Sequence, residues 1–165
     1  MIMFDNISVV VPALDNNQYY SDGDLVRFGD TTLLEWKISQ VLGITSKKNI
    51  YISTPSEKII DLVQSYGVNF VKRSQESDPS QWIKDSVAPI ESEFVLWTHA
   101  TSPFISAGDY RLMLETFFNR LKNHDSLIAV YKEQEYIFFQ STPLNFDVDQ
   151  FRGRKNIEPV YRNTN

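Results

Sequence analysis

The chain has 165 residues, of which 42% are hydrophobic and 13% aromatic, so we expect one folded domain over residues 1–165 and exclude disordered and collagen-like classes. It contains no cysteine, which excludes disulfides and thiolate sites, and its net charge of −5 argues against a nucleic-acid partner. No apolar run reaches the roughly 18 residues of a membrane span and the N-terminus does not resemble a signal peptide, so we expect a cytoplasmic protein without a membrane partner.

Strands and helices are predicted to alternate along the chain. The predicted strands cover residues 7–11, 49–54, 68–71, 94–97 and 126–130, with a sixth at 136–139. The predicted helices begin at Thr31 or Thr32, at Pro55, at Pro79 and near Ala107, and the last one extends to Lys122. This alternation predicts a three-layer α/β/α Rossmann-like fold with a mostly parallel sheet.

The predicted topology brings three polar segments to one edge of the sheet. They are the long loop 13–30, the stretch Ser53-Thr54-Pro55 and the stretch Thr98 to Pro103, and each follows the carboxyl end of a predicted strand. Ligands of doubly wound sheets bind at this edge. A mononucleotide site would therefore draw on these three segments.

Several short motifs occur in an order and spacing typical of one family. They are Ile52-Ser53-Thr54 before a helix that ends at Tyr66-Gly67-Val68, Arg73 with Ser77-Asp78 behind it, Thr101-Ser102-Pro103 after an apolar strand, and Pro159-Val160-Tyr161-Arg162-Asn163, with Arg154 eight residues before Arg162. Together they resemble the CMP-sialate synthetases, or acylneuraminate cytidylyltransferases, from about Ile7 to Asn165.

The resemblance implies transfer of CMP from CTP to a sialic-acid-like (nonulosonic) sugar with release of pyrophosphate. It implies Mg²⁺ as cofactor and a homodimer, although no metal ligand and no catalytic residue can be assigned in this chain. The implied nucleotide-binding residues are Ala13, Leu14, Asp24, Arg73, Asp78, His99, Thr101 and Ser102. Arg154 and Arg162 are implied to bind the carboxylate of the acidic sugar, for which guanidinium groups are well suited.

The first loop departs from the family pattern. Leu14 stands where the family has an arginine, the family's Ser-Lys-Gly has no match, and its Lys-Asn pair aligns with Gly23-Asp24. The loop carries four aspartates (15, 22, 24 and 30) against Arg27, a net charge of −3. Such a loop would repel a triphosphate unless Mg²⁺ or backbone N–H groups compensate.

The later motifs depart as well. His99, Ala100 and Ile105 stand where the family has glutamine, proline and arginine. The aspartates that bind metal in the family would lie beyond Asn165. We therefore expect the chain to lack the C-terminal part of the family fold.

Each candidate also has a structural interpretation. Thr101 and Ser102 could cap a helix, and His99 could serve as a structural hydrogen-bonding residue. Arg73 could be a solvated surface residue, and Arg154 and Arg162 a basic tail.

Two other functions stay open at this point. The departures favour a catalytically degenerate relative that acts as a binding or assembly module. A nucleotide-sugar glycosyltransferase is a weaker alternative, because Asp22-Gly23-Asp24 and Asp147-Val148-Asp149 both spell Asp-x-Asp, a short pattern that often arises by chance.

Overall fold

The computed structural model describes residues 4–74, 78–150 and 153–163. The chain divides into two compact units, Met1–Thr116 and Phe117–Asn165.

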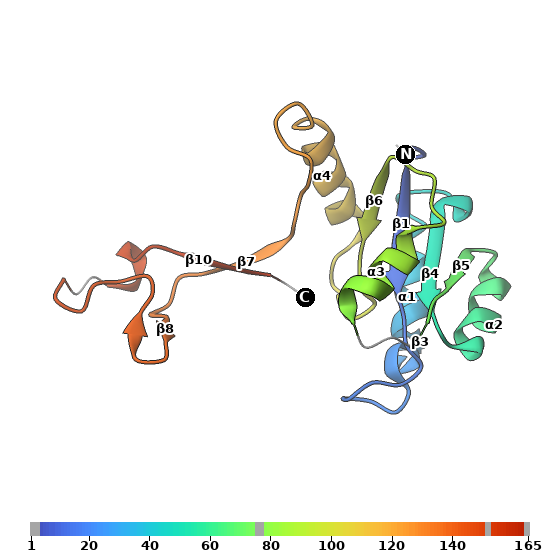
Figure 1. Cartoon of the computed structure of the whole chain (residues 1–165), viewed down its shortest axis with the longest axis horizontal. Coiled ribbons are helices and arrows are strands. Elements are labelled where there is room, and N and C mark those ends of the chain that lie inside the picture. Colours follow the sequence, from blue (N-terminus) through green and yellow to red (C-terminus); the bar gives the residue numbers. More distant parts are fainter. Residues whose placement is uncertain (1–3, 75–77, 151–152, 164–165) are drawn as a thin grey trace. The chain divides into compact units, whose positions relative to one another are not determined.

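A parallel sheet forms the centre of the first unit, with the strand order β5-β4-β1-β6 (Figure 1). The strands are β1 (Ile7–Pro12), β4 (Ile50–Thr54), β5 (Asn69–Lys72) and β6 (Phe94–Trp97). β1 is buried at every position, as its continuous run of β-branched residues predicts for a strand covered on both faces. The order of the strands places β1 between β4 and β6, so the segments that follow β1 lie at the middle of the sheet edge.

Helices cover both faces of this sheet. They are α1 (Leu33–Val41), α2 (Glu57–Tyr66), α3 (Pro79–Val87) and α4 (Ala107–Phe118). α3 packs on one face, where Ser86 Oγ lies 2.5 Å from Ser53 Oγ of β4 (Figure 1). On the other face α1 is hydrogen-bonded to both α2 and α4. The predicted three-layer α/β/α fold is therefore confirmed. Within the described ranges, no helix is long and apolar enough to cross a membrane.

Local sequence signals explain most helix ends. Thr32 begins α1 with a capping box, in which its hydroxyl accepts from Glu35 N while the Glu35 carboxylate accepts from Thr32 N. Gly67 ends α2 in the left-handed region at φ 66°, as predicted. The helix predicted to begin at Pro55 begins at Glu57 instead. Ser56 caps it, whereas the Thr54 hydroxyl accepts a hydrogen bond from Ser56 N.

The loop between β1 and α1 contains short elements that the sequence did not predict. They are a 3₁₀ turn η1 (Gly23–Leu25) and a small hairpin of β2 (Arg27–Phe28) and β3 (Thr31–Thr32). A second 3₁₀ turn, η2 (Lys47–Asn49), leads into β4.

The second unit has little regular structure. Its strands are β7 (Val130–Glu133), β8 (Phe138–Phe139), β9 (Thr142–Pro143) and β10 (Val160–Asn163), with the 3₁₀ turn η3 (Arg154–Asn156). β7 pairs antiparallel with β10, and β8 pairs antiparallel with β9.

Three predicted elements in or next to this unit differ in the structure. The strand predicted over residues 126–130 begins only at Val130, and Ile128 is 65% exposed, because an apolar run alone does not show whether its neighbours will bury it. The last helix ends at Phe118 rather than Lys122, since Arg120 N and Asn123 N donate to carbonyl groups three residues back and the chain turns. The strand predicted over 136–139 is confirmed only at 138–139.

Candidate functional site

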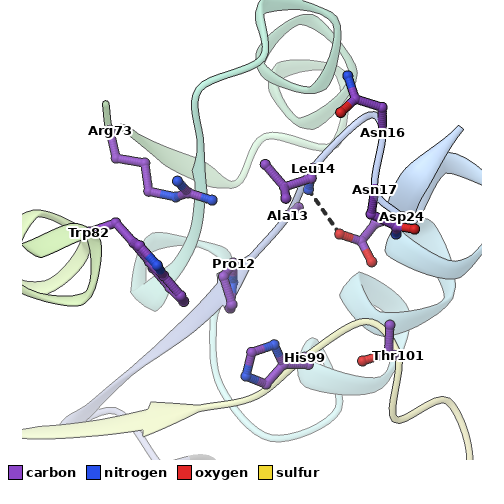
Figure 2. Close-up of a pocket in the computed structure, with 10 residues that line it drawn as sticks. All are labelled: Pro12, Ala13, Leu14, Asn16, Asn17, Asp24, Arg73, Trp82, His99 and Thr101. Carbon is purple, nitrogen blue, oxygen red and sulfur yellow. Dashed lines mark hydrogen bonds between the residues drawn. The ribbon is translucent and has the colours of Figure 1, made fainter. Parts of the chain in front are cut away.

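A pocket of about 370 Å³ lies at the carboxyl ends of β1, β5 and β6 in the first unit (Figure 2). Its lining residues are Pro12, Ala13, Leu14, Asn16, Asn17, Asp24, Arg73, Trp82, His99 and Thr101. The volume is within the range of small-molecule sites, and the position is the one predicted from the topology. We take this pocket as the candidate site.

Most of the predicted nucleotide-binding residues line this pocket. They are Ala13, Leu14, Asp24, Arg73, His99 and Thr101. Asp78 and Ser102 are not among its lining residues: Asp78 caps α3 by accepting from Ser80 N at 2.9 Å, and the carbonyl oxygen of Ser102 accepts from Lys37 Nζ. Ser77, the neighbour of Asp78 in the motif, lies outside the described residues.

The stretch Ser53 to Pro55 has a structural role instead of the predicted place in the site. Ser53 and Thr54 are fully buried, and their hydroxyl groups form hydrogen bonds to Ser86 of α3 and to the Ser56 backbone. None of the three residues is part of the pocket lining.

Arg73 is a buried cation at the end of β5. Only 8% of the residue is exposed, and its guanidinium lies 4.9 Å from the centre of the Trp82 ring (Figure 2). Its Nη1 donates to the Ser74 carbonyl at 3.1 Å, whereas its Nε is buried and has no hydrogen-bond partner among the described residues. Burial lowers the pKa of Arg73. The solvated-surface interpretation of Arg73 is therefore wrong, and its free donor capacity suits an anionic group.

The acidic first loop presents less negative charge to the pocket than its composition predicts. Asp24 lines the pocket and is buried, with its Oδ2 accepting from Leu14 N at 2.8 Å. Burial raises the pKa of Asp24, opposed by this hydrogen bond. Asp15 accepts from the Ser56 hydroxyl at 2.6 Å, and Asp22 and Asp30 are exposed. Of the four aspartates, only Asp24 is part of the described lining.

Gly23 lets the loop fold tightly against itself. It has φ 50°, and a Cβ atom there would lie 2.3 Å from the Leu14 carbonyl oxygen and 2.7 Å from Asn16 N. Both neighbours are backbone atoms, which cannot rotate away. This conformation therefore has no room for a side chain at the position where the resembled family has its lysine.

His99 is held by its aromatic neighbour Trp97. Trp97 Nε1 donates to His99 Nε2 at 3.0 Å, so in the neutral imidazole the hydrogen sits on Nδ1. Burial, and secondarily the charge of Lys37, lower the pKa of His99 below 6.5. His99 is therefore neutral at physiological pH, with Nδ1–H as its remaining hydrogen-bond donor.

Three residues of the site region were missed from the sequence: Pro12 and Trp82, which line the pocket, and Lys37. Trp82 reaches the pocket from α3, and nothing in its helix distinguishes it from an ordinary partly buried aromatic residue. Lys37 of α1 is fully buried beside the loop that follows β6. The sequence does carry a signal that Lys37 is buried. It lies three residues after Leu34 and four before Val41, within the apolar stripe of the helix.

Arg154 and Arg162, the predicted sugar-binding residues, both belong to the second unit. Arg154 Nε lies 2.9 Å from a carboxylate oxygen of Glu135, and Arg162 Nη2 lies 2.7 Å from a carboxylate oxygen of Glu133. Each arginine side chain is 68% exposed. Neither is buried, and both are accessible to an anionic ligand.

The described residues offer no ready metal site. No group of three or more His, Asp or Glu side chains in the part of the chain that the structure describes could hold a metal ion. Asp24 is the one carboxylate in the described lining of the pocket. These residues therefore do not fit an all-protein Mg²⁺ site.

The fold and the position of the pocket define a Rossmann-like domain with a candidate ligand site at the carboxyl edge of its sheet. The profile of the cytidylyltransferase family matches residues 24–155, which is most of the chain. The chain therefore belongs to the cytidylyltransferase family. No significant match was found among curated proteins.

Several solved structures share the fold at low sequence identity. A cytidylyltransferase from Leptospira borgpetersenii serovar Hardjo-bovis is 19% identical, with a TM-score of 0.61 over 79% of this chain and 54% of that one. A CMP:2-keto-3-deoxy-manno-octonic acid synthetase complexed with CTP is 14% identical, with a TM-score of 0.62 over 94% of this chain and 73% of that one. The 4-diphosphocytidyl-2C-methyl-D-erythritol synthase of Anaerococcus prevotii is 16% identical, with a TM-score of 0.62 over 96% of this chain and 71% of that one. The chain thus spans about half the length of the Leptospira protein.

Proposed function

We propose that the protein transfers CMP from CTP to a sialic-acid-like (nonulosonic) sugar and releases pyrophosphate. The observation that carries the proposal is Arg73, a buried guanidinium in the pocket wall with an unpartnered Nε and no ion-pair partner among the described residues. A buried charge without a counter-charge is costly, so an anionic ligand in this pocket would be stabilised. Membership of the cytidylyltransferase family makes the phosphates of CTP the natural anion.

The reaction would be an in-line displacement at the α-phosphorus of CTP. The anomeric hydroxyl oxygen of the sugar forms the new bond to phosphorus and its proton passes to solvent water. The bond to the oxygen bridging the α- and β-phosphates breaks, and its electron pair leaves with the pyrophosphate. Arg73 would stabilise negative charge on the nucleotide. His99 Nδ1–H and the Thr101 hydroxyl would be hydrogen-bond donors to it, since both residues line the pocket.

Mg²⁺ would have to be bound largely by the nucleotide. Proteins commonly hold Mg²⁺ through one or two carboxylates together with substrate phosphates. When bound it would neutralise phosphate charge. Since the described residues do not form a metal site, we assign no step to it.

The acidic sugar is proposed to bind Arg154 and Arg162. Each would exchange its present glutamate partner for the carboxylate of the sugar, which a guanidinium can bind through two hydrogen bonds. Because both ion pairs are exposed, breaking them costs at most about 1 kcal/mol each.

Two measurements test the proposal. CTP with Mg²⁺ should raise the melting temperature, because a ligand selective for the folded state stabilises it. Pyrophosphate should then be released with CTP and a nonulosonic acid, but not with CTP and a neutral sugar alcohol. The proposal fails if millimolar CTP with Mg²⁺ leaves the melting temperature unchanged.

A second function is a binding or assembly module without catalysis. It is favoured by the first loop, where Leu14 replaces the expected arginine and the backbone around Gly23 excludes a lysine. This alternative predicts that CTP raises the melting temperature while no pyrophosphate appears with any nonulosonic acid. The two assays together therefore separate it from the enzyme.

A homodimer is proposed from the second unit. Among the described hydrophobic residues of this unit only Ile157 is buried, whereas Ile128, Phe139 and Val148 are each at least 65% exposed. A unit that buries so little apolar surface gains little stability by itself, so an association that covers these side chains would stabilise it. A second copy of the chain is the occupant that the family resemblance implies.

A further inference from the structure

Lys37 is a buried ammonium group without a counter-charge. The residue is 0% exposed, and its Nζ donates to the Ser102 carbonyl oxygen at 2.8 Å and to the Tyr110 hydroxyl at 2.7 Å. None of the ion pairs among the described residues includes Lys37. Lysine is almost never fully buried unless it is paired, so this arrangement calls for an explanation.

The contacts of Lys37 connect it to the loop that forms one wall of the pocket. Ser102 N donates to the His99 carbonyl, so the Ser102 carbonyl belongs to the turn that carries His99 and Thr101. The Tyr110 hydroxyl lies 2.6 Å from Thr98 Oγ1, at the start of the same loop. Lys37 thus contacts the loop directly at Ser102 and through Tyr110 at Thr98.

We propose that Lys37 is a positioning residue which supplies, from behind this loop, positive charge that the acidic first loop lacks, and which takes up a proton when the nucleotide binds. The inference rests on the proposed function, because it needs an anionic ligand in the pocket. It adds a residue that neither the motifs nor the lining of the pocket include.

The electrostatics of the region support this role. Burial lowers the pKa of Lys37 to about 8, so a fraction of the free protein holds it neutral at slightly alkaline pH. Its charge also contributes to lowering the pKa of His99, so its field reaches the pocket wall. The titratable groups that face it are Tyr110 of α4, whose pKa burial raises, and His99. Neither supplies a negative charge near neutral pH.

Calorimetry measures the proton directly. CTP with Mg²⁺ is titrated into the protein at pH 8.5 in two buffers of different ionisation enthalpy. The difference between the two observed binding enthalpies gives the number of protons taken up. At this pH the nucleotide phosphates are fully ionised and His99 is neutral. We expect uptake of about half a proton per CTP, because an anion raises the pKa of a nearby ammonium group.

Matched variants separate charge from hydrogen bonding. Lys37→Gln keeps a donor for the Ser102 carbonyl and removes the charge, whereas Lys37→Met removes both. We expect both variants to lose the proton uptake and to bind CTP at least about fivefold more weakly. Lys58→Gln, an exposed lysine on α2, should behave as wild type. The melting temperature of each variant is recorded first, so that a misfolded variant is replaced by the other.

The outcomes are distinct. Proton uptake that persists in the Lys37 variants, or wild-type affinity in Lys37→Gln, overturns the charge role of Lys37 and leaves the proposed function intact. The charge role of Lys37 is also overturned if the wild type binds CTP without taking up a proton. If wild type binds no CTP at all, the proposed function itself fails, and this inference with it.

Discussion

At the residue scale, Arg73 and Lys37 carry the positive charge around a pocket that has few charged groups of its own. Both are buried, and neither forms an ion pair among the described residues. Removing a charge of this kind should change ligand binding more than it harms folding, since a buried ion can be replaced by a neutral group at little cost in stability.

Arg73→Lys should weaken CTP binding about tenfold, and Arg73→Gln more strongly. Lysine keeps the charge but loses the planar contact with Trp82 and the paired donors of the guanidinium. Titration calorimetry with CTP and Mg²⁺ measures the loss. Arg27→Gln is the control, because Arg27 is exposed and donates to the nearby Gly29 carbonyl. Equal affinities for the Arg73 and Arg27 variants would remove Arg73 from the site.

Lys37→Met should stabilise the free protein by roughly 1 to 3 kcal/mol at pH 7. The folded-state pKa of about 8 lies below the unfolded value of 10.5, so folding opposes protonation and the wild type is penalised at neutral pH. Between pH 8 and 10 the unfolded chain keeps the proton that the folded chain releases, and the penalty fades. Urea unfolding of both proteins at pH 7, 8.5 and 10 should therefore show the advantage of the variant shrinking. If the difference in unfolding free energy between the two proteins stayed constant from pH 7 to pH 10, it would contradict the lowered pKa of Lys37.

Lys37→Gln should also raise the pKa of His99. Burial is the larger cause of the lowered pKa and remains, whereas the repulsion from Lys37 is lost, so the value moves back towards 6.5. The chain has two histidines, and a His124→Gln variant assigns their NMR signals. The titration of His99 should be unchanged by Lys58→Gln.

At the element scale, the loop between β1 and α1 depends on close backbone packing. Asp24 N donates to the Leu14 carbonyl at 2.7 Å while the Asp24 carboxylate accepts from Leu14 N, and Gly23 packs against the same segment. This arrangement fixes the backbone that lines one side of the pocket. It also explains why a basic side chain cannot simply be restored at position 23.

Gly23→Ala should therefore cost more stability than Gly67→Ala. Both glycines have positive φ, 50° and 66°, so both changes carry a similar conformational penalty of about 1 kcal/mol. A Cβ at Gly67 would meet only the flexible Lys47 side chain at 3.7 Å, whereas at Gly23 it would clash with the backbone. Chemical unfolding should give a difference of at least about 1 kcal/mol between the variants, and only Gly23→Ala should also weaken CTP binding. Equal losses of stability in the two variants would mean that the backbone of the loop moves aside to accommodate the added Cβ.

At the scale of the whole molecule, the two units differ in how they are stabilised. The first unit has a core of buried aliphatic side chains around β1, and the second has almost none among its described residues. A segment with so little buried apolar surface gains little stability by itself. Association between copies is the way in which we expect it to be covered.

Light scattering coupled to size-exclusion chromatography should show a dimer. The double variant Ile128→Lys with Phe139→Lys should shift it towards monomer, because it places charges on two strongly exposed apolar positions of the second unit. Leu112→Lys, a comparably exposed apolar position on α4, is the control. A wild-type protein that stays monomeric at 100 µM would contradict the dimer proposal.

The sequence by itself determined the layered α/β fold and the edge of the sheet where the candidate pocket lies. Continuous β-branched strands, a capping box at Thr32 and a glycine at position 67 are local signals, and they act through short-range sterics and hydrogen bonds. They therefore predicted the helices and parallel strands of the first unit well. Most of the nucleotide-binding residues that the family resemblance implied lie in the lining of the candidate pocket.

Only the tertiary structure decided which charges face the pocket. Desolvation and partner choice depend on residues distant in the chain, as in the burial of Arg73 against Trp82, the pairing of Asp15 with Ser56, and the contact of Lys37 with Ser102. The exposed segment near Ile128 was mispredicted for the same reason, since an apolar run does not reveal whether another element will cover it. Most carboxylates of the first loop, which is acidic by composition, are not part of the described pocket lining. Buried cations at the end of β5 and on α1 lie around the site.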